Sequence, residues 1–228
     1  MKPDPPNELF TPNRNLNHQL NRLLPLFDAE SQKAIAKNLR FKRAAAIKHK
    51  PTTIRAQIFD IYAELILGEH LLNLGFCVRY SQKLDDKTPD WLDMQSRLMV
   101  DVVTAGPPAE VFEQVDRLGA WCGFAEADGV PQSEVRIHKA IESKAAKYRQ
   151  IIRKHDLRYV VAVYGSFEND ASLADGRRAI ERWNPFEGRP HISGILYYLH
   201  SESEFSFVYF NNPKAECPID LSGRLAGR

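Results

Sequence analysis

The sequence predicts an α/β protein in which helices cover both faces of a β-sheet, with a helical extension at the N-terminus. From residue 76 onward, short apolar runs rich in β-branched and aromatic residues are interleaved with segments whose apolar residues have helical spacing. The chain has 228 residues, of which 43% are hydrophobic and 26% charged, a composition typical of a folded protein with a substantial core. We therefore expect one folded domain and an N-terminal extension.

Helices are expected through the first third of the chain. Residues 1 to 16 are rich in proline and asparagine and predict an arm, whereas apolar residues recur at helical spacing from Leu16 to Leu39, with Pro25 dividing two helices. Pro51 begins a long helix that Gly75 ends. We assign the arm and the extension to residues 1–50 and the main domain to residues 51–228.

The remaining elements should build the sheet and its covering helices. Strands are expected at residues 76–80, 91–94, 98–103 and 158–164, with a hairpin formed by residues 192–199 and 205–210. Helices are expected at residues 109–118, 133–154 and 172–182. This order of elements predicts a sheet between two layers of helices.

The charges are unevenly distributed although the net charge is only +2. No acidic residue lies between Glu30 and Asp60, residues 85–134 are rich in Asp and Glu, and residues 136–158 are basic again. An acidic centre between two basic elements suits a metal site inside a phosphate-binding cleft, although a basic run can equally be a solvated helix face. The candidate nucleic-acid contacts are Arg40, Lys42, Arg43, Lys48, Lys50 and Lys147.

Cellular location is inferred from the cysteines and the chain start. Cys77, Cys122 and Cys217 are odd in number and far apart, which favours a reducing compartment. The first residues lack the apolar core of a secretory signal, and no apolar run reaches the length of a membrane span. We expect a cytoplasmic protein that does not enter the membrane.

Two aspartates form the most informative pattern. Asp90 follows Pro89 at the start of one expected strand, and Asp101 lies eleven residues later among the apolar residues of the next. Burying a carboxylate is costly unless a cation or hydrogen bonds compensate it, and two neighbouring strands could bring both carboxylates together. Two carboxylates and a backbone carbonyl would make a site for Mg²⁺ or Mn²⁺. Taken alone, Asp90 could instead cap a turn.

Glu64 interrupts an apolar helical segment and is the third acidic candidate. On its own it would be read as a surface residue of an amphipathic helix, and Glu69, nearer the helix end, is a weaker substitute.

The order of these features resembles the PD-(D/E)XK nuclease superfamily, particularly its small restriction-endonuclease-like members. The resemblance covers residues 53–219 and depends on Ala63-Glu64-Leu65, Pro89-Asp90-Trp91, Asp101-Val102-Val103, residues 141–148, the strand at 159–164 and the Asn212-Pro213-Lys214-Ala215 segment. It implies a restriction-endonuclease-like mixed β-sheet and an active site of Glu64, Asp90, Asp101 and a lysine.

The position of that lysine departs from the family pattern, because Val103 occupies the place where the motif has lysine. Some members of the superfamily carry the functional lysine on a following helix, which implies Lys144, with Lys147 as the second choice. Both could equally be solvated lysines of a basic helix.

The resemblance implies a metal-dependent nuclease that hydrolyses nucleic acid, with DNA favoured over RNA. Asp90, Asp101 and Glu64 would bind Mg²⁺ or Mn²⁺, and Lys144 would assist the chemistry. A homodimer is compatible with cutting both strands of a duplex. The alternative is a catalytically degenerate module of the same fold that binds nucleic acid or protein, or a structural subunit that needs no metal.

Overall fold

The computed structural model describes residues 14–48, 51–105, 132–165, 172–201 and 204–221, and the expected helix at residues 109–118 lies outside these ranges. The first three helices are α1 (Arg14–Leu23), α2 (Ala29–Lys48) and α3 (Pro51–Asn73), with the short 3-10 helix η1 (Leu24–Leu26) between α1 and α2. This confirms the helices expected on both sides of Pro25 and the long helix that begins at Pro51.

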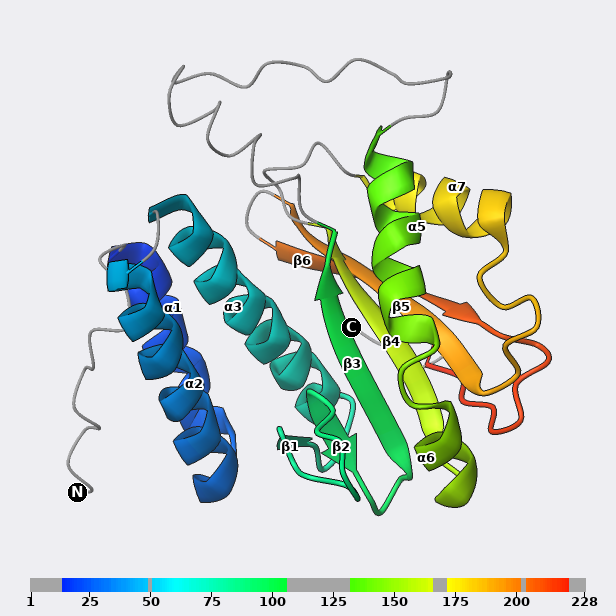
Figure 1. Cartoon of the computed structure of the whole chain (residues 1–228), viewed down its shortest axis with the longest axis horizontal. Helices are drawn as coiled ribbons and strands as arrows, with labels where there is room; N and C mark the ends of the chain where they lie inside the picture. The colour runs from blue at the N-terminus through cyan, green and yellow to red at the C-terminus, as the bar shows by residue number, and fades with distance from the viewer. Residues whose placement is uncertain (1–13, 49–50, 106–131, 166–171, 202–203, 222–228) are drawn as a thin grey trace.

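A six-stranded mixed sheet forms the centre of the molecule (Figure 1). The strands are β1 (Arg79–Tyr80), β2 (Trp91–Asp93), β3 (Leu98–Thr104), β4 (Arg158–Gly165), β5 (Ile192–Ser201) and β6 (Glu204–Asn211), and they lie side by side in sequence order. β3, β4 and β5 are parallel to one another, whereas β1, β2 and β6 pair antiparallel with their neighbours. The parallel part of the sheet is buried on both faces.

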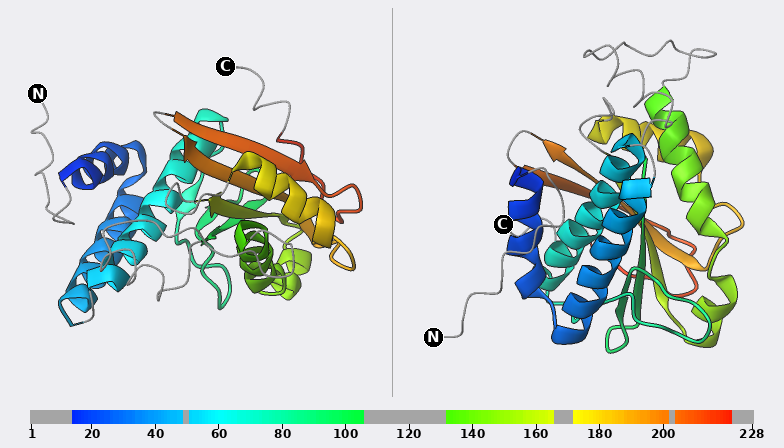
Figure 2. Two further views of the ribbon diagram at one scale, coloured as in Figure 1. Left: turned by 90° about the horizontal axis from the view of Figure 1, so that it is seen from above. Right: turned by 60° about the vertical axis from the view of Figure 1, so that its left-hand side comes forward.

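Helices cover both faces of the sheet, as expected (Figure 2). One apolar core joins α1, α2 and α3 to alternate strand residues such as Val100 and Val102. The other joins α5 (Gln132–Ala145), α6 (Arg149–Lys154) and α7 (Leu173–Trp183) to the intervening strand residues such as Met99 and Val161. The prediction of an α/β protein with a sheet between two helical layers is confirmed.

Two expected elements differ in extent. The strand expected at residues 76–80 is only Arg79–Tyr80, and the Cys77 amide donates to the side-chain Oδ2 of Asp93 (2.9 Å) instead of to a backbone carbonyl of β2. The single helix expected at 133–154 is divided into α5 and α6 by a turn at residues 146–148. That turn lies beside the candidate site described below.

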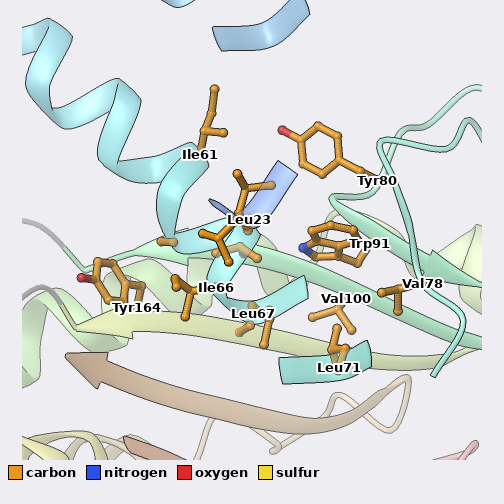
Figure 3. Packing of buried hydrophobic residues seen from close by; sticks show 14 of the residues in the cluster. Leu23, Ile61, Ile66, Leu67, Leu71, Val78, Tyr80, Trp91, Val100 and Tyr164 are labelled. Carbon is orange, nitrogen blue, oxygen red and sulfur yellow. The ribbon is translucent and has the colours of Figure 1, made fainter. Parts of the chain in front are cut away.

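A close approach between α3 and β2 fixes the local geometry of the first core. Gly68 of α3 lies against the indole of Trp91, and a Cβ on Gly68 would be only 2.2 Å from Cζ2 of the ring. Trp91 is fully buried and contacts Phe27 and Tyr80, with ring centroids 4.9 and 5.2 Å away. Figure 3 shows Trp91 next to Tyr80 in this core. The absence of a side chain at Gly68 thus allows the helix to pack closely on the strand.

Among the helices that the structure describes, none is both long and apolar enough to cross a membrane.

Candidate active site

The two predicted aspartates meet where β2 begins. Trp91 pairs with Val100 across the β2–β3 ladder, so Asp90, the residue before β2, lies beside the middle of β3. The Val102 amide donates a 2.6 Å hydrogen bond to Oδ2 of Asp90. Asp101 is completely buried and projects toward the α5 layer, because its neighbours Val100 and Val102 pack in the opposite core. The hairpin therefore brings Asp90 and Asp101 together, as the sequence suggested.

Two lysines and a tyrosine surround the Asp101 carboxylate. Nζ of Lys144 lies 3.0 Å from Oδ2 of Asp101 and 3.9 Å from Oδ2 of Asp90, so this lysine bridges both aspartates. Nζ of Lys147 lies 3.4 Å from the same Asp101 oxygen. The hydroxyl of Tyr148 is 3.3 Å from Oδ1 of Asp101 and also 3.3 Å from the carbonyl oxygen of Thr88. Both predicted lysines thus reach the predicted acid.

The turn that ends α5 explains how neighbouring side chains converge on one carboxylate. Lys144 lies in the last turn of α5, while Lys147 and Tyr148 lie in the turn before α6. The Tyr148 ring is 1% exposed and packs edge-on against Tyr159, with centroids 5.8 Å apart. A continuous helix would give these side chains fixed helical directions, whereas the turn lets both Lys147 and Tyr148 face Asp101.

Glu64 is held from two directions in the middle of α3. Its Oε2 accepts a 2.5 Å hydrogen bond from the hydroxyl of Tyr80, and its backbone carbonyl accepts a 2.9 Å bond from the indole nitrogen of Trp91. Burial raises the pKa of Glu64 to about 7, even though Tyr80 and Lys42 favour the ionised form. Glu64 is therefore not a solvated surface residue, which was the alternative reading of its position.

The carboxylates act on one another electrostatically. Burial raises the pKa of Asp90 well above its ordinary value, and the charges of Glu64 and Asp101 raise it further. Burial alone would lower the pKa of Lys144, but the charges of Asp101 and Asp90 raise it overall, so this lysine stays protonated. The arrangement is a cluster of three carboxyl groups whose negative charge is balanced in part by Lys144.

The donor set fits a hard divalent ion in chemistry, although not in its present arrangement. Across the described ranges, no group of three His, Cys, Asp or Glu side chains is arranged to hold a metal ion. Asp90 and Asp101 nevertheless offer adjacent carboxylate oxygens, the ligands that Mg²⁺ and Mn²⁺ prefer. Lys144 now neutralises this pair. Metal binding would therefore depend on Asp90 and Asp101, with Glu64 contributing directly or through water.

Three further residues bind groups of the site, and the sequence pattern had not singled them out. Tyr80 binds Glu64, Tyr148 binds Asp101, and Asp60, one turn before Glu64 on α3, accepts a 2.7 Å hydrogen bond from Oγ1 of Thr104 on β3. Asp60 follows an apolar helical pattern four residues ahead of Glu64, and this spacing could have indicated it. Nothing local in the sequence distinguishes the two tyrosines from ordinary core residues.

Two further positions considered in the sequence, Glu69 and Val103, make contacts outside the cluster of Asp90, Asp101 and Glu64. Glu69, the weaker substitute for Glu64, forms a two-pronged ion pair with Arg22 of α1 at 2.7 and 3.1 Å. Val103, which stands where the motif has lysine, is partly buried against the core of α5, α6 and α7. Neither contributes a charged group to the cluster.

Of the predicted nucleic-acid contacts, the structure describes the side chains of Arg40, Lys42 and Lys147. Arg40 is exposed on α2, whereas Lys42 is partly buried and its charge acts on Glu64. Arg43 and Lys48 belong to α2, but the placement of their side chains is not described, and Lys50 lies outside the described residues. Lys147 is in the cluster itself. These residues remain predictions as contacts.

Comparison of the chain with models of protein families, with characterised proteins and with solved structures gave no match.

Proposed function

We propose that this protein is a metal-dependent nuclease of the PD-(D/E)XK type with a restriction-endonuclease-like fold, acting on nucleic acid and preferentially on DNA. The observation that carries the proposal is the position of Lys144. Its ammonium bridges the buried Asp101 and the adjoining Asp90, although the motif position on β3 is occupied by Val103. The contact of Lys144 with both aspartates supports assigning it the role of the motif lysine.

The proposed chemistry assigns a separate task to each side chain. Asp90 and Asp101 would hold Mg²⁺ or Mn²⁺, with Glu64 beside them. The ion would polarise the scissile phosphate and lower the pKa of a bound water. Lys144 would orient the attacking water or neutralise the charge that develops on the phosphoryl oxygens, since its raised pKa keeps it cationic at neutral pH. Tyr148 would keep the Asp101 carboxylate in its orientation.

The substrate is proposed from charge. Lys144 and Lys147 lie at the cluster, Lys42 acts on it from α2, and these cations would attract a polyanion toward the acidic centre. A homodimer would provide two sites for cutting both strands of a duplex. A cytoplasmic location agrees with the cysteine pattern and remains part of the proposal.

The direct test is a cleavage assay on single-stranded and double-stranded DNA and RNA, in Mg²⁺ and separately in Mn²⁺. The wild-type protein should cut at least one substrate, EDTA should stop the reaction, and Asp90→Asn and Asp101→Asn should abolish it. Asp93→Asn is the matched control for Asp101→Asn, because Asp93 is similarly buried but accepts bonds from Cys77 and Ser96 instead. Cleavage that survives in Asp101→Asn would contradict the assignment.

One observation favours a second candidate, the non-catalytic module. Asp101 already has Lys144, Lys147 and Tyr148 as partners, so its buried charge is compensated without a metal. A degenerate nuclease domain could keep this arrangement for stability and bind nucleic acid or protein. Nucleic-acid binding that is unaffected by EDTA, together with no Mn²⁺ binding, would support this candidate over the enzyme.

A further inference from the structure

Tyr80 connects the acidic cluster to the N-terminal helical extension. The hydroxyl of Tyr80 donates to Oε2 of Glu64 at 2.5 Å and accepts from Nδ2 of Asn38 at 3.3 Å. The backbone amide of Tyr80 donates to Oγ of Ser31 at 2.9 Å. Ser31 and Asn38 both belong to α2, so α2 fixes Tyr80 at its backbone and at its hydroxyl.

The direction of these hydrogen bonds is set by chemistry. A phenol keeps its proton at neutral pH, so the Tyr80 hydroxyl is the donor to the Glu64 carboxylate. An amide nitrogen can only donate, so Asn38 fills the acceptor capacity of the same hydroxyl. The result is a chain of two hydrogen bonds that runs from α2 through Tyr80 to the Glu64 carboxylate.

We propose that Tyr80 is a positioning residue for Glu64, and that α2 supports the active site by holding Tyr80 through Ser31 and Asn38. This inference rests on the proposed function. Glu64 lies in the middle of a long helix, and a glutamate side chain has several rotatable bonds. Trp91 fixes only its backbone carbonyl. Tyr80 is the group that holds one carboxylate oxygen, so it decides where the other oxygen can point.

Packing accounts for the Tyr80 ring but not for its hydroxyl. The ring is 5% exposed and lies edge-on to Trp91 in the first core, and phenylalanine would fill the same space (Figure 3). The hydroxyl could be replaced by hydrogen without opening a cavity of any size. Its short bond to Glu64 is therefore the feature that needs another explanation, and orienting a candidate metal ligand supplies one.

The expected effect follows from comparable hydrogen bonds to metal ligands. Removing such a partner commonly lowers metal affinity or activity by about 10- to 100-fold. Since Glu64 is one of three candidate ligands and need not contact the ion directly, the lower end applies. Tyr80→Phe should weaken Mn²⁺ binding by about tenfold, and Asn38→Ala, which removes only the weaker 3.3 Å bond, should weaken it less.

Tyr198 provides a matched control. Its hydroxyl is fully buried and donates a 2.8 Å bond to the carbonyl of Ala63, the residue before Glu64 on α3. Tyr198→Phe therefore removes an equally buried hydroxyl from the same turn of the same helix without touching the Glu64 carboxylate. A merely structural role for Tyr80 would make the two Tyr→Phe variants behave alike.

The experiment is a calorimetric Mn²⁺ titration of the full chain as wild type, Tyr80→Phe, Asn38→Ala and Tyr198→Phe, with the melting temperature of each protein measured alongside. We expect Mn²⁺ binding to be weakest in Tyr80→Phe, less weakened in Asn38→Ala, and equal to wild type in Tyr198→Phe. In cleavage assays at fixed Mn²⁺, Tyr80→Phe should lower kcat and leave the KM for nucleic acid unchanged.

Two outcomes would overturn the inference, and they can be told apart. If wild-type protein binds Mn²⁺ and Tyr80→Phe binds it equally well, Tyr80 does not position Glu64 and the proposed metal site survives. If the wild-type protein binds no Mn²⁺, the proposed function fails and the role of Tyr80 fails with it. Should Tyr80→Phe not fold, Asn38→Ala decides, and wild-type affinity in that variant overturns the inference.

Discussion

Replacing Asp101 by asparagine separates the charge of this residue from its shape. The side chain is fully buried, and its two oxygens face the ammonium groups of Lys144 and Lys147 and the hydroxyl of Tyr148. Asparagine has nearly the same volume and can still accept a hydrogen bond from the tyrosine. The substitution therefore removes one negative charge and leaves only a weaker, neutral ligand for a metal ion, while the packing of β3 stays in place.

The cost to stability can be bounded from the partners left behind. Breaking a fully buried ion pair costs about 3–5 kcal/mol, because the remaining charge is stranded in a dry environment. Here the Lys144 and Lys147 side chains are 20% and 43% exposed, and Lys144 keeps Asp90 at 3.9 Å. Partial hydration and this second partner reduce the loss to about 1–2 kcal/mol. For a chain of this size the melting temperature should fall by roughly 2–8 °C.

The assay pairs thermal unfolding in EDTA with calorimetric Mn²⁺ titration of wild type, Asp101→Asn and Asp93→Asn. Both Asp93→Asn and Asp101→Asn should be less stable than wild type. Wild-type protein and Asp93→Asn should nevertheless bind Mn²⁺, whereas Asp101→Asn should not. Asp93 is 2% exposed and its carboxylate accepts from two backbone amides, so its replacement reports the cost of disturbing a buried aspartate. Wild-type Mn²⁺ affinity in Asp101→Asn would refute the reasoning.

Three further variants test other parts of the site. Lys144→Met should slow cleavage about a hundredfold while Mn²⁺ binding persists, because the lysine serves the chemistry and not the metal; normal cleavage rates in this variant would remove Lys144 from the mechanism. Glu64 has its pKa raised from 4.5 to about 7, so the folded chain binds a proton that the unfolded chain releases. Metal-free protein should therefore lose up to about 3 kcal/mol as the pH rises from 4.5 to 7. Urea unfolding in EDTA should show a steeper loss with pH in wild type than in Glu64→Gln, where Asp90, whose pKa is also raised, still contributes; equal slopes would contradict the assignment. Arg40→Glu and Lys42→Glu, tested separately in DNA-binding titrations over a range of salt, should each weaken binding and flatten the log–log salt dependence by about 1; a variant with the wild-type slope identifies a residue that does not contact phosphate.

Local sequence pattern was sufficient for most elements of the fold. The buried strand β4 reads as a continuous apolar run, and the helices on both sides of Pro25 follow from apolar spacing and from the geometry of proline. The failures have a common cause. β1 is shorter than expected where the carboxylate of Asp93 takes the Cys77 amide, and α5 ends early where Tyr148 turns into the core. Both are side-chain contacts between distant parts of the chain, which periodicity cannot report.

The same limit applies to the candidate site. The proximity of Asp90 and Asp101 could be predicted, because Asp90 directly precedes one strand of a hairpin and Asp101 lies on the other. The role of Lys144 could be predicted only through the family resemblance. Tyr80 could not be identified as a partner of Glu64, because the two residues are sixteen positions apart, on a helix and on a strand that meet only in the folded chain. The charge of Lys42 on Glu64 likewise arises only when α2 folds back onto α3.

The bond between Asp90 and the Val102 amide also affects how the protein meets its neighbours. β2 pairs with β3 only along residues 98–100 of β3. In the described part of the chain, no strand continues this ladder along residues 102–104 on the same side of β3. An open strand edge invites pairing with a strand of another molecule. Here an incoming strand would have to displace Asp90 from the amide and bring its carbonyl groups next to a cluster of carboxylates. We therefore expect Asp90 to disfavour pairing at this edge, so that its neutralisation would lower solubility as well as activity.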